Sequence, residues 1–187
     1  MSGIEVERGL ISAADKRGLS SFCRFLSNIG VELFATSGSL GYLRDRGINA
    51  NSVSELTGFN ELLDGKVKTL SPELHAGILG SKDELEEINQ PRFKKIDLVV
   101  VNLYDYEKKR EIDIGGHALI RSAAKNYENT VVLTKSRDYL EFTNEFRKNK
   151  SISKEFSLEK AIEALEYTSE YDKKITKALK DIKEKKK

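Results

Sequence analysis

Ile96-Asp97-Leu98-Val99-Val100-Val101-Asn102-Leu103 is the stretch that decides the fold class of this 187-residue chain. Its apolar middle is unbroken, whereas a strand with one face in water would alternate apolar and polar residues. An uninterrupted run of this length is typical of a parallel strand whose two faces are both covered by helices. The stretch therefore predicts an α/β fold built on a buried, mainly parallel sheet.

Strand-like and helix-like patterns alternate along the rest of the chain. Short apolar runs predict further strands at residues 9–12, 31–36, 51–53 and 130–133. Apolar residues at helical spacing predict helices at residues 19–29, 39–46, 115–125 and 136–148 and from residue 156 onward, with Ser39 as a candidate N-cap. Such alternation implies right-handed crossovers, and hence a doubly wound sheet with helices on both faces. We expect one domain over residues 1–187, with a core of about 8–135 and C-terminal helices over about 136–187.

Composition limits the classes of function. The 32 basic and 30 acidic residues give a formal charge of +2, so no overall field attracts the chain to nucleic acid or to a membrane. Acidic residues also interrupt the lysine-rich stretch at residues 180–187, which we interpret as a solvated helix end. We find no apolar stretch of signal-peptide or membrane-spanning length. We therefore expect a cytoplasmic protein that binds neither nucleic acid nor membrane.

One cysteine and two histidines leave little scope for disulfide or metal chemistry. Cys23 lies in an apolar helical stripe, where packing explains a cysteine better than nucleophilic reactivity does. His75 and His117 are too few to complete a His/Cys metal site with it. We therefore expect no intramolecular disulfide and no metal.

Two cationic segments punctuated by glycine indicate an anion-binding site. The first, Asp64-Gly65-Lys66-Val67-Lys68-Thr69-Leu70-Ser71-Pro72, presents two lysines and a threonine within residues 54–75, a segment with no clean period. A loop of that length in a compact domain is usually functional. The second combines Ile112-Asp113-Ile114-Gly115-Gly116 with Arg121-Ser122-Ala123-Ala124-Lys125-Asn126. The pair predicts a phosphorylated small-molecule ligand with the Asp113 carboxylate beside it.

The predicted sheet brings further polar residues to the same place. Ligands bind parallel sheets at the carboxyl ends of the strands, where residues 12–16, 36–39 and 102–104 follow three predicted strands. Backbone N–H groups at the start of a helix, with serine hydroxyls and lysine charges nearby, are suited to bind a phosphate. The sequence therefore predicts a phosphate cradle at this edge.

Seven motifs, in order, resemble the IMP cyclohydrolase family. They are Leu10-Ile11-Ser12 with Asp15-Lys16-Arg17-Gly18, Ser54-Glu55-Leu56-Thr57-Gly58-Phe59, Val67-Lys68-Thr69-Leu70, His75-Ala76-Gly77-Ile78-Leu79, Asn102-Leu103-Tyr104, Ile112-Asp113-Ile114-Gly115-Gly116 and Arg121-Ser122-Ala123-Ala124-Lys125-Asn126. The resemblance runs from about Gly9 to Tyr171. It implies a methylglyoxal-synthase-like fold and an IMP cyclohydrolase half without the AICAR transformylase half to which that family is joined.

The resemblance also implies a reaction. This is the dehydrative ring closure of 5-formamidoimidazole-4-carboxamide ribonucleotide (FAICAR) to IMP, the last step of purine biosynthesis. It implies no cofactor, a homodimer, and a separate formyl-transferring enzyme as the source of the substrate. An amide is a poor nucleophile, so positioning and oxyanion stabilisation must supply most of the acceleration.

Roles for individual residues follow from the same resemblance. Lys68 is expected to bind substrate and polarise the formyl group, and Tyr104 to hydrogen-bond at the reacting centre. Asp113 and Lys125 are expected to form the pair that moves protons. The residues expected to line the base pocket are Asn102, Gly115 and Gly116, and those expected to hold the ribose phosphate are Ser12, Lys16, Thr36, Ser37, Gly38, Ser39, Lys66 and Thr69.

The chain departs from the family pattern at several positions. Ala14 stands where the family has Ser, Lys66 where it has Arg, Ser71 where it has His, and Asp105 where it has Pro. Lys66 keeps the charge but loses a bidentate fork, which predicts weaker phosphate binding. The connection over residues 106–112 is shorter than in the family, and we expect it to lack a helix. The cover over the base pocket is then reduced or supplied by another subunit.

The residues taken alone leave alternatives open. Asp113 before a Gly-Gly pair is also typical of a turn or cap, and Lys125 of a lysine that complements a helix dipole. Tyr104 fits an amphipathic rim, and His75 fits a structural histidine. The same fold serves methylglyoxal synthase, a lyase, and a non-catalytic regulatory module of carbamoyl-phosphate synthetase. Neither rival explains the second cationic segment.

Overall fold

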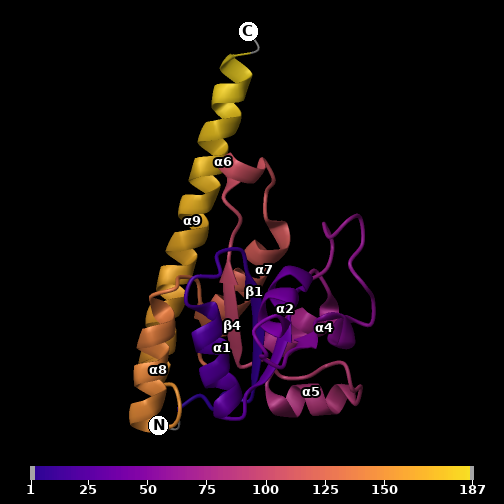
Figure 1. The fold of residues 1–187 in the computed structure, drawn as a ribbon, viewed down its shortest axis with the longest axis vertical. Coiled ribbons are helices and arrows are strands. Elements are labelled where there is room, and N and C mark those ends of the chain that lie inside the picture. Colours follow the sequence, from indigo (N-terminus) through magenta and orange to yellow (C-terminus); the bar gives the residue numbers. More distant parts are fainter. Residues whose placement is uncertain (1–2, 186–187) are drawn as a thin grey trace.

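Residues 3–185 are described by the computed structural model, and their strands form one five-stranded parallel sheet (Figure 1). The strands are β1 (Arg8–Ala13), β2 (Glu32–Ala35), β3 (Asn51–Ser52), β4 (Leu98–Asn102) and β5 (Val131–Leu133), in the order β3-β2-β1-β4-β5. Helices lie on both faces of this sheet. The predicted α/β fold is confirmed.

β4 is the strand predicted by the long apolar run. Leu10 of β1 lies opposite Val99, and Val99 in turn lies opposite Val132 of β5. All the residues of β4 are buried. A strand with neighbours on both edges and helices on both faces has no side in water, which explains why its apolar residues are continuous.

Two groups of helices cover the two faces. On one face lie α1 (Leu19–Asn28), α2 (Ser37–Arg44) and α8 (Asp138–Asn149), and on the other lie α3 (Ser54–Thr57), α4 (Pro72–Leu79), α7 (Ile114–Lys125) and α9 (Lys154–Glu184). Successive strand residues serve alternate faces: Leu10 and Val99 pack beneath α7, and Ile11 and Val100 pack beneath α1. The predicted C-terminal helices therefore pack directly on the sheet.

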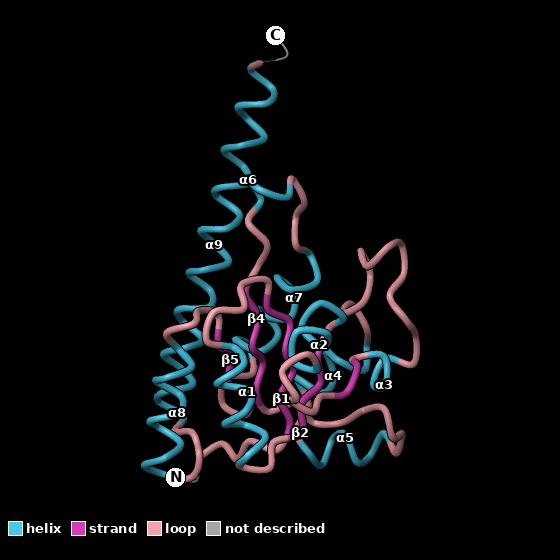
Figure 2. The backbone as a smooth tube through the Cα atoms, in the orientation of Figure 1, coloured by secondary structure: helices cyan, strands magenta, loops and turns pink. Residues whose placement is uncertain are grey.

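The strand order places a switch point between β1 and β4. The chain builds outward from β1 to β3 and then crosses to β4 and β5 on the other side. Connections leave β1 and β4 toward opposite sides, and in open parallel sheets ligands bind at the carboxyl ends of the strands at such a point. In Figure 1 this edge faces α6 (Tyr106–Lys109) and the upper part of α9, and Figure 2 shows loops gathered above it.

The prediction that Ser39 caps the helix after β2 is wrong. α2 begins two residues earlier, at Ser37, and its N-cap is Thr36. The Ser39 hydroxyl instead accepts a hydrogen bond from the backbone N–H of Ala13 at 3.1 Å. A serine bound to the neighbouring strand is not available to cap its own helix, so the sequence signal was misleading.

Short helices account for the other differences. Residues 54–75 contain α3 and the first turn of α4, so the loop is confined to residues 58–71. A helix α5 (Lys82–Ile88), begun by a capping box between Ser81 and Glu84, follows α4 and was not predicted. The expectation that residues 106–112 lack a helix is also wrong, since α6 forms one turn there with Asp105 as its N-cap.

Two expectations about individual segments can be checked. Cys23 is fully buried, and burial raises the pKa of its thiol to about 12, so packing is its role. The lysine-rich end is an exposed continuation of α9 as far as Glu184, and Lys186 and Lys187 lie outside the described residues. Over residues 3–185, no helix combines the length and the apolar character needed to cross a bilayer.

Lys95 is a buried cation at the amino end of the sheet. Its ammonium donates to the Thr130 hydroxyl at 2.8 Å and to the Ile96 carbonyl at 3.1 Å, and lies 3.4 Å from the Ile78 carbonyl at the end of α4. Burial lowers the pKa of Lys95 to about 8, although the Asp97 carboxylate acts in the opposite direction. Lys95 therefore ties α4 to the start of β4 and β5.

We predict that the free energy of unfolding rises between about pH 8 and pH 9. An unfolded lysine keeps its proton up to about pH 10.4, whereas folded Lys95 begins to lose it near pH 8, so the unfolded chain binds more protons in this window. Within the same window Cys23 acts in the opposite direction and reduces the rise, because the unfolded thiol loses its proton near about pH 8.5 and the folded one keeps it. Urea unfolding at pH 8 and pH 9 should show a rise of at most about 1.4 kcal/mol, absent in Lys95→Met. An equal rise in the variant would contradict this assignment.

Candidate active site

Asn102 joins the ends of the two strands at the switch point. Its side-chain carbonyl accepts from the backbone N–H of Asp15 at 2.6 Å, and its side-chain N–H donates to the Asp15 carbonyl at 3.1 Å. The Asn102 backbone carbonyl accepts from the N–H of Ala14 at 3.3 Å. Asn102 was predicted to line a base pocket, but its amide is used to hold the turn that delivers Lys16.

Lys16 and the start of α2 lie where the sequence predicts a phosphate cradle. The Lys16 ammonium donates to the Ser39 hydroxyl at 3.2 Å and to the Ala13 carbonyl. On the same side, the Thr36 hydroxyl donates to the Ser12 hydroxyl at 3.2 Å. The first N–H groups of a helix have no intrahelical acceptor, so those of α2, at Ser37 and Gly38, point toward this cluster.

The loop over residues 58–71 brings Lys68 to the same helix end. The Lys68 ammonium lies 3.7 Å from the Glu61 carboxylate, which also accepts from the Ser37 hydroxyl at 3.1 Å. Glu61 therefore links the loop to the first residue of α2. Lys66 lies in the same loop, and within the described residues its side chain has no hydrogen bond or ion pair.

The first turn of α7 packs tightly against this loop. Asp113 is the N-cap of α7, and its carboxylate accepts from the N–H of Gly116 at 2.8 Å. A Cβ atom on Gly115 would lie 2.4 Å from the hydroxyl of Thr69, which is 3% exposed. Only glycine permits this approach, so Thr69 and the start of α7 are held in one arrangement.

Tyr104 and Lys109 complete the edge. The Lys109 ammonium lies 4.0 Å from the centre of the Tyr104 ring, a cation–π contact. Burial lowers the pKa of Lys16, and the charges of Lys109 and Lys68 lower it further. Two ammonium groups from separate segments therefore act on the charge of Lys16, and clustered cations of this kind are suited to bind an anion.

Lys125 lies at the other end of the sheet. Asp113 caps the start of α7 and Lys125 is its last residue, so roughly 18 Å of helix separates them at 1.5 Å per residue. The next residue, Asn126, donates to the Ile78 carbonyl at the end of α4, on the amino side of the sheet. The prediction that Asp113 and Lys125 form a proton-moving pair is wrong within a single chain, because one helix holds them apart.

Other side chains have structural partners. The ring nitrogen Nδ1 of His75 lies 2.8 Å from the Ser122 hydroxyl, and burial lowers the pKa of this histidine. Two residues that depart from the family pattern are helix caps: Ser71 accepts from the N–H of Leu74 in α4, and Asp105 from the N–H of Glu107 in α6. These positions therefore serve local structure.

Tyr167 and Tyr171 of α9 support the site and were not predicted. The Tyr167 hydroxyl accepts from the backbone N–H of Leu103 at 2.9 Å, and the Tyr171 hydroxyl accepts from that of Asp113 at 2.9 Å. They lie one helical turn apart on the buried side of α9. Two tyrosines four residues apart in an otherwise charged segment could have indicated a buried side of the helix. Buried tyrosines need a hydrogen-bond partner for the hydroxyl, which the sequence does not identify.

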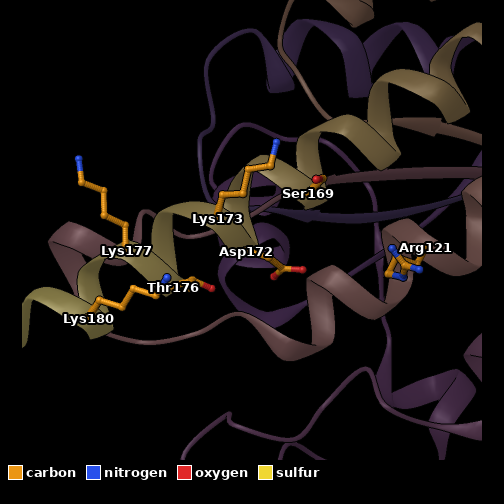
Figure 3. A pocket seen from close by; sticks show the side chains of 7 residues that line it. All are labelled: Arg121, Ser169, Asp172, Lys173, Thr176, Lys177 and Lys180. Carbon is orange, nitrogen blue, oxygen red and sulfur yellow. The ribbon is translucent and has the colours of Figure 1, made fainter. Parts of the chain in front are cut away.

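Two hollows lie along α7 and α9. One, of about 610 Å³, is lined by Arg121 of α7 and by Ser169, Asp172, Lys173, Thr176, Lys177 and Lys180 of α9 (Figure 3). In Figure 3, Asp172 points toward the space between the helices, whereas Lys173 and Lys177 extend away from it. The other, of about 530 Å³, reaches Asp113. We assign the site to the sheet edge because exposed lysines dominate the larger hollow and provide no fixed donors.

A sheet of this order, with cations gathered at its switch point, defines an α/β domain with a cationic edge. The chain belongs to the MGS-like domain family, whose model matches residues 18–131. A second model, the AICARFT/IMPCHase bienzyme, matches residues 123–187.

Curated relatives extend the similarity to nearly the whole chain. The bifunctional purine biosynthesis protein PurH of Chlorobium phaeobacteroides is 43% identical over 96% of this chain, and that of Leptospira biflexa is 40% identical over 92%. The chain spans about 37% of the length of these relatives. Among solved structures, that of ForH superposes with a TM-score of 0.81 at 28% identity, covering 90% of this chain and 94% of ForH.

We predict that Gly115→Ala lowers kcat/KM for the reaction proposed below by about 10- to 100-fold. The new methyl group would displace Thr69 and, with it, the loop that bears Lys68, and misplacement by about 1 Å has consequences of this size. Gly41→Ala in α2 is the matched control, since its Cβ meets nothing within 4 Å. Steady-state assays of both variants test this, and equal activities would show that the contact is unimportant.

Proposed function

We propose that this chain is an IMP cyclohydrolase, which closes the ring of FAICAR to give IMP and water. The observation that supports this best is the convergence of Lys16, Lys68 and Lys109 beside the Asp113-capped start of α7. A ribonucleotide supplies a phosphate for the cations, and ring closure needs a proton acceptor next to them. Similarity to the bifunctional PurH proteins, one part of which this chain resembles, supports the same choice.

We assign phosphate binding to the residues around the start of α2. Lys16, the N–H groups at the start of α2 and the hydroxyls of Ser12, Ser37 and Thr69 supply donors of the kind that a phosphate accepts. Lys66 adds charge from the loop. These contacts hold a part of the substrate that does not react, so they serve to place the reacting groups.

We assign ring closure to the residues around the start of α7. The carboxamide nitrogen attacks the formyl carbon, a new C–N bond forms, and the formyl oxygen becomes a hydroxyl. Lys68 and Tyr104 stabilise negative charge on this oxygen as it develops. Asp113 accepts the proton that the carboxamide nitrogen releases. The C–O bond then breaks, the formamide nitrogen gives up its proton, and the oxygen leaves as water while a C=N bond forms.

The wider setting is part of the proposal. We propose a cytoplasmic enzyme that acts as a homodimer without metal or cofactor, and that receives its substrate from a formyl-transferring activity. The rival functions, a lyase acting on a triose phosphate and a non-catalytic regulatory module, also use a phosphate cradle. The assay below distinguishes them, because only a cyclohydrolase makes IMP.

We predict that the purified chain converts FAICAR to IMP in the presence of a chelator and without folate or nucleotide. Ultraviolet absorbance follows the product directly. Asp113→Asn should lower kcat by roughly 10²- to 10⁴-fold with little change in substrate binding, as expected for loss of a general base. If the folded chain binds IMP but does not turn over FAICAR, the enzyme proposal is wrong and the chain is a ligand-binding module.

We predict that Asp113→Asn and Lys125→Met act independently. Substitutions separated by more than about 10 Å without shared partners are usually additive in free energy. The fall in kcat of the double variant should therefore equal the product of the two single falls. If Lys125→Met alone lowers kcat, a double variant no slower than the slower single variant would contradict this, and would mean that the two side chains meet, as they would across two copies of the chain.

A further inference from the structure

The connection between Tyr104 and Asp113 has a defined structure. Asp105 caps α6 by accepting from the N–H of Glu107 at 3.0 Å, and Tyr106 is buried in the core, 8% exposed. Arg110 then takes a left-handed conformation, with φ of 57°, which ends the helix and turns the chain back. The one-turn helix is therefore anchored from below and reversed at a fixed point.

Both ends of this connection are fixed by α9. The hydrogen bonds from Leu103 to Tyr167 and from Asp113 to Tyr171 lie immediately before and after it. The two tyrosines are one turn apart on a continuous helix, so the separation of the two ends is set by helix geometry. The position of α6 above the edge thus follows from contacts within this chain.

The two lysines of α6 point to different places. The Lys108 ammonium lies 3.9 Å from the Asp105 carboxylate, and its side chain is 83% exposed. The Lys109 ammonium lies over the face of Tyr104, 4.0 Å from the centre of the ring. Tyr104 follows Asn102 by two residues, and Asn102 holds the turn that bears Lys16. Both residues are exposed, but the Lys109 ammonium lies on the side of Tyr104, whereas that of Lys108 lies beside Asp105.

We propose that Lys109 is a substrate-binding residue that contacts the nucleotide phosphate, and that α6 covers the site from within the same chain. This rests on the proposed function. It removes the need for a second subunit to supply the cover, which the sequence left open. It also explains how the site tolerates Lys66: the donors that a lysine lacks relative to an arginine fork are supplied by a further lysine from α6.

The electrostatics support this role. The charge of Lys109 lowers the pKa of Lys16 more than the charge of Lys68 does. A dianionic phosphate between the ammonium groups of Lys16 and Lys109 replaces repulsion with attraction, so each of these two cations strengthens the binding of the same group. The Tyr104 ring holds the Lys109 ammonium in place by the cation–π contact while the phosphate binds.

Calorimetric titration with IMP and with inosine tests the proposal. Lys109→Met should weaken IMP binding by about tenfold, the usual effect of one charge-assisted hydrogen bond, and should leave inosine binding unchanged. Lys108→Met, one residue away on the same turn, should bind both ligands as the unmodified chain does. Lys109→Arg should restore most of the affinity, because it retains the charge.

The results distinguish failure of the Lys109 contact from failure of the proposed function. Unchanged IMP binding by Lys109→Met, or equal losses for IMP and inosine, would overturn the phosphate contact while leaving the proposed function in place. A loss of the same size in Lys108→Met would reduce the effect to general surface charge and would also overturn it. If the unmodified chain does not bind IMP at all, the proposed function and this inference both fail.

Discussion

The paired hydrogen bonds between the Asn102 side chain and the backbone of Asp15 are the constraint on which the site depends. They join the carboxyl ends of β1 and β4 across the switch point, where the two strands would otherwise diverge into separate connections. Because both groups are fixed, the turn after β1 presents Lys16 toward the start of α2 and Tyr104 leaves β4 toward α6. Substitution of this buried amide would leave polar backbone groups without partners.

The cations at the edge work against the stability of the fold. The charges of Lys109 and Lys68 both act against the charge of Lys16, and Glu61 is a close carboxylate partner of Lys68. Such unfavourable pairs are typical of functional sites, where the ligand supplies the missing charge. Lys160, a buried cation elsewhere in the chain, is by contrast paired with Glu163 at 2.9 Å and lies 3.6 Å from Asp138.

The sequence predicts the framework well, because its signals are local. The apolar run at β4 and the spacing in α1, α7 and α9 reflect burial, which periodicity records directly. Short helices such as α3, α5 and α6 are not detected by periodicity, since one or two turns are too short for a repeating apolar pattern. Ser39 misleads because its hydroxyl bonds to β1, a partner 26 residues away that no local pattern reveals.

The site residues also separate into those that the sequence identified and those that only the structure reveals. Lys16, Lys68 and Asp113 were found from glycine-punctuated segments and from resemblance, and they fall at one edge because parallel strands place them there. Lys125 was attributed to that edge as well, but the length of α7 separates it from Asp113, a fact that residue types alone do not express. Lys109 and the tyrosines of α9 become visible only when α6 is placed in three dimensions.

A crystal structure of the chain with bound IMP tests the central claim most directly. The account predicts the phosphate between Lys16, the start of α2 and Lys109, with the base beside Tyr104 and the first turn of α7. IMP bound instead in the hollow between α7 and α9, with its phosphate on Arg121 and the lysines of α9, would contradict the assignment of the site to the sheet edge.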